Sequence, residues 1–192
     1  MEVSDIYGEL PTLETERLWL RKMTPNDVDA IFSYASNEEV TKYVTWPVHR
    51  SHTDSEAFVQ FVLSQYEQGK IAPWGIEHKQ DKQLIGTVDF VSWQPKHQIA
   101  ELGYALSHHY WGLGLMTEAA NELLALGFKS MDLVRIQARC FCENIGSRRV
   151  MEKIGMSYEG TLRKGFFSKG QHYNLKLYSI LKEEFLERTK GG

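Results

Sequence analysis

Two glycines stand one residue apart in the run from Trp111 to Glu118, directly before a segment with an amphipathic helical pattern. A glycine turn that leads into a helix gathers free backbone N–H groups at the positive end of the helix dipole, and phosphate oxygens bind there. The run Ile99–Leu106 upstream has the pattern of a β-strand, so the order is strand, glycine turn, helix. This order favours phosphate binding, although two nearby glycines also occur in ordinary tight turns.

The residues around these glycines exclude two common nucleotide-binding loops. A Walker loop needs a lysine after its last glycine, and Gly114 is followed by leucine and methionine. A dinucleotide fingerprint needs a third glycine, and Thr117 stands at that position. The backbone alone must therefore bind the anion.

A second segment, Asn144–Met156, has the features of a short helix. Asn144 is a good N-cap, because its side-chain oxygen can accept hydrogen bonds from first-turn N–H groups. Val150, Met151 and Ile154 recur at helical spacing, and Gly155 is a typical C-terminal stop. These features alone are equally typical of a purely structural helix.

Together, the two segments resemble conserved parts of the GNAT superfamily of acetyl-CoA-dependent N-acetyltransferases. The glycine run resembles its pyrophosphate loop, and Asn144–Met156 resembles its N-x-x-S-x-x-x-x-x-K-x-G-[FM] helix. The blocks Leu13–Arg21, Glu101–Leu106 and Glu159–Arg163 resemble the Rim-type branch, which acetylates the N-termini of ribosomal proteins. The resemblance covers nearly the whole chain.

This resemblance implies an α+β fold with three layers, α-β-α. A mostly antiparallel mixed sheet is flanked by helices on both faces, and its central strands splay apart to hold acyl-CoA. It also implies that residues 1–192 form a single acetyltransferase domain, with residues 1–11 as an N-terminal extension. The residues expected to bind coenzyme A are Leu106, His109, Trp111, Gly112, Leu113, Gly114, Leu115, Met116, Thr117, Asn144 and Ser147. His109 stands where the family commonly has glutamine or arginine, so a permanent cation is lost there.

Moving acetyl from a thioester to an amine requires a proton to leave the amine, a donor for the oxyanion and a proton for the leaving thiolate. Glu101 is the candidate base, acting through a water; the alternative is a solvated carboxylate on a wet face of the sheet. The resemblance implies Ser147 as the candidate acid, because the Rim-type branch has a serine at this position, and Met151 stands where many other family members have a tyrosine. Alternatively, the Ser147 hydroxyl bonds only to the helix backbone.

The sequence is compatible with three hypotheses about what receives the acetyl group. The Rim-type resemblance implies a protein N-terminal α-amine. A small amine such as a polyamine, amino acid or antibiotic is the second hypothesis. A non-catalytic acyl-CoA-binding protein is the third, and both Met151 and Asn174, which stands where the family often has aspartate, favour it weakly.

The composition narrows the class of protein further. The 192 residues are 42% hydrophobic with a formal net charge of −3, which is typical of a soluble globular protein and argues against nucleic-acid binding. No apolar run reaches the length of a membrane span, and no signal-peptide core follows Met1. The two cysteines, Cys140 and Cys142, lack further ligands at metal-binding spacing. We therefore expect a cytoplasmic monomer or homodimer with no metal, no membrane contact and no direct nucleic-acid contact.

The remaining elements follow from hydrophobic periodicity and caps. Thr24 and Asn37 are expected to cap two short helices. Longer helices are expected at 54–68 and 115–129, and strands at 12–22, 73–78, 84–93, 99–106, 134–141, 158–166 and 172–181.

Overall fold

The computed structural model describes residues 1–190, which fold around one mixed eight-stranded sheet. Its strand order is β1-β2-β3-β4-β5-β6-β8-β7. The strands are β1 Leu13–Glu14, β2 Leu18–Arg21, β3 Trp74–His78, β4 Gln83–Gln94, β5 Ile99–Leu106, β6 Arg135–Phe141, β7 Ser157–Ser168 and β8 Gln171–Leu181. Every neighbouring pair is antiparallel except β5 and β6, which are parallel.

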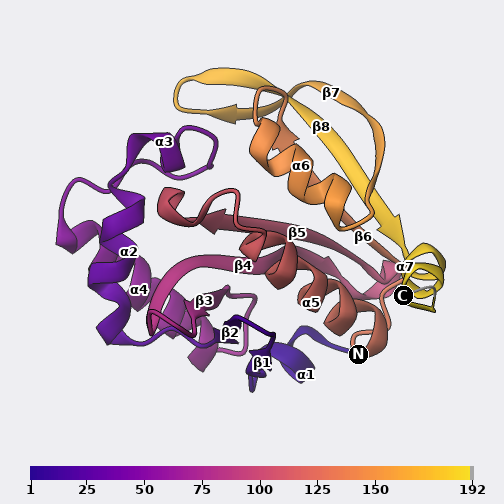
Figure 1. Ribbon diagram of the computed structural model, residues 1–192, viewed down its shortest axis with the longest axis horizontal. Helices are drawn as coiled ribbons and strands as arrows, with labels where there is room; N and C mark the ends of the chain where they lie inside the picture. Colours follow the sequence, from indigo (N-terminus) through magenta and orange to yellow (C-terminus); the bar gives the residue numbers. More distant parts are fainter. Residues whose placement is uncertain (191–192) are drawn as a thin grey trace.

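Helices cover both faces of this sheet (Figure 1). They are α1 Val3–Tyr7, α2 Val28–Ala35, α3 Glu38–Thr41, α4 His52–Glu67, α5 Leu115–Lys129, α6 Ile145–Lys153 and α7 Lys182–Lys190. Short 3₁₀ turns lie at Pro25–Asp27 (η1), Pro95–His97 (η2) and His108–Tyr110 (η3). Helices α5 and α6 lie on the near side of the sheet in Figure 1, and α2 packs on β4 from the other side. The expected α+β architecture with helices on both faces is confirmed.

The central strands β5 and β6 pair over only part of their length. Their register runs from Ile99 opposite Arg135 to Leu102 opposite Ala138, yet β5 continues to Leu106 and β6 to Phe141. Beyond that point each strand is held only from its outer side, β5 by β4 and β6 by β8. The strands therefore part after Leu102 and leave unpaired backbone groups on both sides of the gap, as the resemblance implied.

The N-terminal region differs from the sequence prediction in one respect. The single strand expected at 12–22 is instead two short strands, β1 and β2, that pair antiparallel with each other. The residues between them form a turn, because the Thr15 hydroxyl and the Arg17 backbone N–H both donate to the Glu118 carboxylate of α5. Residues 1–11, expected as an extension, pack two side chains, Tyr7 and Leu10, into the core, and most of their other residues are exposed.

The expected caps are present. Asn37 Oδ1 accepts a hydrogen bond from the Glu39 N–H at the start of α3, and the Thr24 side chain takes part in a capping box with Asp27. The helix expected at 54–68 begins two residues earlier, at His52, because Ser51 and Asp54 form a capping box there. Local polar chemistry thus sets the helix boundaries.

Candidate functional site

The glycine loop joins β5 to α5 and leaves its backbone donors free. Gly112 and Gly114 both have positive φ angles, 77° and 78°, which other residues rarely adopt. The first N–H of this region with a protein acceptor is that of Glu118, which donates to the Gly114 carbonyl at 3.0 Å. Among the described residues, no acceptor receives a hydrogen bond from the N–H groups of residues 112–117. These groups form a site for an anion at the start of the helix.

Two aromatic residues hold the loop against the sheet. The Trp111 indole N–H donates to the Leu106 carbonyl at 2.8 Å, across the turn from β5. The Tyr110 hydroxyl donates to Asp81 at 2.6 Å, and Asp81 also lies 2.8 Å from His78 Nδ1. The loop is therefore fixed to the end of β5 and to the β3–β4 hairpin before any ligand binds.

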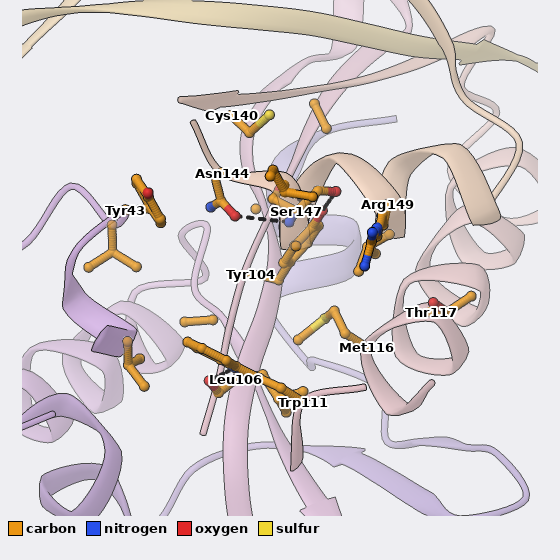
Figure 2. A pocket seen from close by; sticks show the side chains of 18 of the residues that line it. Tyr43, Tyr104, Leu106, Trp111, Met116, Thr117, Cys140, Asn144, Ser147 and Arg149 are labelled. Carbon is orange, nitrogen blue, oxygen red and sulfur yellow. Dashed lines mark hydrogen bonds between the residues drawn. The ribbon is translucent and has the colours of Figure 1, made fainter. Parts of the chain in front are cut away.

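A cavity of about 640 Å³ opens where β5 and β6 part, between the loop and α6. Figure 2 shows its walls, with Leu106, Trp111, Met116 and Thr117 below Tyr104 and Ser147. The walls include most of the residues expected to bind coenzyme A, namely Leu106, Trp111, Gly112, Gly114, Leu115, Met116, Thr117, Asn144 and Ser147. Two expected residues, His109 and Leu113, lie on the same segment but outside these walls.

The N-terminus of α6 forms one wall of the cavity. The Asn144 side chain accepts a hydrogen bond from the Ser147 N–H at 3.0 Å, so Asn144 is the N-cap (Figure 2). Ser147 Oγ lies 2.9 Å from the hydroxyl of Tyr104, which also donates to the Ser147 carbonyl. Sequence reasoning missed Tyr104. The available signal was its position on β5, on the same side as Leu106, which faces the cavity.

Neither of the other candidate donors near α6 has the right chemistry. Met151 is fully buried, so its position offers packing and no proton. Cys140 lines the cavity, but burial raises the pKa of its thiol to about 11. Because a thiol with that pKa stays protonated at neutral pH, Cys140 is a poor nucleophile. No group of three His, Cys, Asp or Glu side chains within residues 1–190 is arranged to hold a metal ion.

Glu101 lies one residue before the point where β5 and β6 part. Its Oε1 accepts from Arg139 Nε at 2.7 Å, and its Oε2 accepts from Gln137 Nε2 at 3.1 Å. A carboxylate has about four lone-pair sites, so each oxygen can accept another donor. Glu101 itself is not among the residues lining the cavity, although its neighbours Leu102 and Arg139 are.

A second carboxylate, Asp89, lies near the same point. It is opposite Gly103 in the β4–β5 register, on the face of the sheet that also carries Glu101. No group among residues 1–190 donates a hydrogen bond to its side chain, and burial raises its pKa to about 7. Sequence reasoning missed Asp89, because its isolation depends on the packing of α2 and α4 over β4.

Comparison with known proteins now gives the family. Residues 17–157 match the acetyltransferase (GNAT) domain family. The uncharacterized N-acetyltransferase YoaA of Bacillus subtilis is 37% identical over 172 residues, which cover 90% of this chain and 97% of that protein. The ribosomal-protein-serine acetyltransferase of Escherichia coli is 26% identical, with coverage of 86% and 93%. A GNAT-family acetyltransferase structure from Bacillus anthracis superposes with a TM-score of 0.80 at 32% identity, covering 90% of this chain and 99% of that one.

The chain belongs to the GNAT family of N-acetyltransferases. Its acyl donor is acetyl-CoA, its acceptor is an amine, and its fold is that of the family. The free amides before α5 fit a diphosphate, which needs several donors and no protein carboxylate directed at it. Within the described residues, no helix combines the length and hydropathy that crossing a bilayer requires.

The partly buried Asp89 carboxyl predicts a pH-dependent stability. Its folded-state pKa of about 7 lies above the ordinary value, so between these values the folded protein keeps a proton that the unfolded chain releases. The free energy of unfolding therefore falls as the pH rises from about 4 to about 7. Between pH 5 and pH 8 we expect wild type to lose about 2 kcal/mol more than Asp89→Asn. Urea unfolding at both pH values measures this difference, and parallel pH profiles would refute it.

Proposed function

We propose that the protein transfers acetyl from acetyl-CoA to a protein N-terminal α-amine, by direct attack within a ternary complex. The observation that carries the coenzyme A site is the set of free N–H groups at residues 112–117, next to the gap between β5 and β6. In this proposal the amides bind the diphosphate. The pantetheine arm, which carries amide groups of its own, lies between the parted strands and bonds to their unpaired backbone. That arrangement brings the thioester near Ser147.

The residues at the point of parting supply the proton transfers. Glu101 accepts, through a water, the proton that the attacking amine loses. Ser147 passes its hydroxyl hydrogen to the departing sulfur, and the Tyr104 hydroxyl, 2.9 Å from Ser147 Oγ, turns from the Ser147 carbonyl to donate to that oxygen as the proton leaves. Bound acetyl-CoA would supply the thioester: the amine nitrogen forms the new C–N bond to its carbonyl carbon, and the C–S bond breaks when the tetrahedral intermediate collapses. An N–H group on the unpaired edge of β5 stabilises the oxyanion.

The β7–β8 hairpin supports a peptide acceptor with acidic residues after its amine. Between Gly160 and Leu177 the chain carries four Arg or Lys residues, Arg163, Lys164, Lys169 and Lys176, and no Asp or Glu. The hairpin reaches over to α3, where Lys169 Nζ donates to the Thr41 carbonyl (Figure 1). Near its tip, Tyr173 stacks on Phe141, which directly follows Cys140 of the cavity wall.

These charges separate the peptide hypothesis from the polyamine hypothesis. Two exposed carboxylates, Glu39 and Glu143, lie in the cavity wall and attract a single ammonium group. The cationic hairpin repels a chain that carries further positive charges and attracts one with negative charges. A small polyamine therefore fits less well than the N-terminus of an acidic segment. Against a non-catalytic role, Ser147 and Glu101 keep the hydrogen-bonding capacity that transfer needs.

The diphosphate site predicts the effect of Gly114→Asp. Aspartate adds a negative charge among the free amides and must adopt the positive φ of Gly114. We expect the affinity for coenzyme A to fall by at least about 100-fold, because the aspartate carboxylate repels the negatively charged diphosphate. Isothermal titration measures the affinity, and circular dichroism checks the fold. Unchanged affinity in a folded variant would exclude the site.

The assignment of Glu101 as the base predicts a loss in turnover. In Glu101→Gln we expect kcat to fall by about 100-fold or more, since general base catalysis typically contributes that factor, while the Kd of coenzyme A stays the same. Asp89→Asn, on the same face, is the matched control and should keep kcat within a few-fold of wild type. If only the Asp89 variant loses activity, the base is Asp89 and the Glu101 assignment is wrong.

The hairpin charges predict an acceptor preference. With peptides of equal length, we expect acidic residues at positions two to four to raise kcat/KM by about tenfold over lysines, and added salt to reduce this ratio. The double variant Arg163→Gln with Lys164→Gln should weaken the preference. Thiol release measures these rates, with spermidine as the competing small amine. Faster acetylation of spermidine than of any peptide would overturn the peptide assignment.

A further inference from the structure

Arg17 connects the turn between β1 and β2 to the glycine loop, nearly one hundred residues away in the sequence. Its Nη1 donates to the Leu113 carbonyl at 3.0 Å. Its Nε donates to Glu118 Oε2 at 2.7 Å, and its Nη2 lies 2.7 Å from the same oxygen. The other oxygen of Glu118 accepts from the Arg17 backbone N–H at 2.8 Å and from the Thr15 hydroxyl at 2.6 Å. One arginine thus holds both the loop and the first turn of α5.

The bond to the Leu113 carbonyl fixes the direction of the next N–H group. In a trans peptide the C=O of one residue and the N–H of the next point in opposite directions. Because Arg17 draws the Leu113 carbonyl toward the β1–β2 turn, the Gly114 N–H points away from that turn. The positive φ angles of Gly112 and Gly114 allow the neighbouring peptides to adopt the matching orientation.

The ion pair also adjusts the charge beside the anion site. Glu118 lies in the first turn of α5, where an unpaired carboxylate would repel a bound phosphate. Burial acts against its ionisation, but the hydrogen bonds from Thr15 and Arg17 hold the pKa of Glu118 below its usual value. Arg17 neutralises this carboxylate and keeps a permanent cation beside the loop, whereas His109 replaces the cation of the family pattern elsewhere in this segment.

We propose that Arg17 and Glu118 form a clamp that preorganises the free amides of residues 112–117 for the diphosphate of coenzyme A. The inference rests on the proposed diphosphate site and assigns Arg17 as a positioning residue. A fixed loop pays less conformational entropy on binding, so its affinity for the diphosphate is higher than that of a mobile loop. Leu113, which lies outside the cavity wall, contributes through its carbonyl and not through its side chain.

Two substitutions separate a clamp from simple charge attraction. Arg17→Met removes a cation, and Glu118→Gln removes an anion, so charge alone predicts opposite effects on anion binding. The clamp predicts that both variants weaken coenzyme A binding, because both release the loop. Arg17→Lys keeps the positive charge with fewer donors, and it serves as a second variant if Arg17→Met does not fold.

Arg21 offers a matched control on the same segment. Its guanidinium binds Asp27 with two hydrogen bonds of 2.8 and 2.9 Å and also contacts Glu77, and no hydrogen bond or ion pair within residues 1–190 joins it to the loop. Arg21→Met therefore removes an ion pair of similar extent without releasing the loop. We expect it to lower the midpoint of thermal unfolding while the Kd of coenzyme A stays within twofold of wild type.

The experiment compares donors with and without the diphosphate. In Arg17→Met and Glu118→Gln we expect the Kd of coenzyme A and the KM of acetyl-CoA to rise about tenfold, with kcat retained, since the lost interaction is one of ground-state binding. For S-acetylpantetheine, which has no diphosphate, we expect kcat/KM to change by less than about twofold. Titration calorimetry and thiol-release kinetics on the folded variants give both values.

Three results would overturn the clamp. These are an unchanged Kd in both variants, tighter binding by Glu118→Gln, and an equal loss with S-acetylpantetheine, which would mark a general structural role. Gly114→Asp separates this inference from the proposed function. If that variant still binds coenzyme A, the diphosphate site itself is wrong. If it loses binding while the Arg17 variants do not, only the clamp is wrong.

Discussion

The structure depends on a set of backbone N–H groups that the fold cannot satisfy by itself. The first turn of any α-helix leaves donors without partners, and here the two preceding glycines add more of them in one small volume. Such donors favour an anion, and the ends of β5 and β6 keep the space in front of them open. The loop therefore leaves backbone donors without protein acceptors, and in the proposed function these donors bind the diphosphate of coenzyme A.

The one parallel strand pair explains why this site lies in the middle of the sheet. Parallel strands need a crossover connection, and α5 is the crossover between β5 and β6. Its N-terminus must lie at the end of β5, which is also where the two strands separate. The separated end of β5 pairs with β4, and that of β6 pairs with β8, in both cases antiparallel. The proposed anion site and the cavity thus both result from the α5 crossover between the parallel strands β5 and β6.

Much of this arrangement could be predicted from the sequence, because it rests on local signals. The glycine spacing, the Asn144 cap and the alternation along Ile99–Leu106 each act within a few residues. The gap between the strands came from the family resemblance, since periodicity does not report where pairing stops. The split of the first strand was missed, because it depends on hydrogen bonds from Thr15 and Arg17 to Glu118.

The other features that the sequence did not predict also depend on contacts between residues distant in the sequence. Tyr104 meets Ser147 across two elements, and Arg17 meets Leu113 across 96 positions, so no short window of sequence contains either contact. Nothing in the sequence around Asp89 marks it out, and its pKa is raised because its carboxyl group is shielded from water in the fold. His109 and Leu113, which the family resemblance places among the residues that bind coenzyme A, do not line the cavity.

A crystal structure with coenzyme A bound tests the central claim most directly. We predict diphosphate oxygens at about 2.7–3.2 Å from backbone nitrogens within residues 112–117, with the pantetheine arm running between the parted ends of β5 and β6. A diphosphate bound elsewhere, with these amides turned toward protein acceptors, would contradict it.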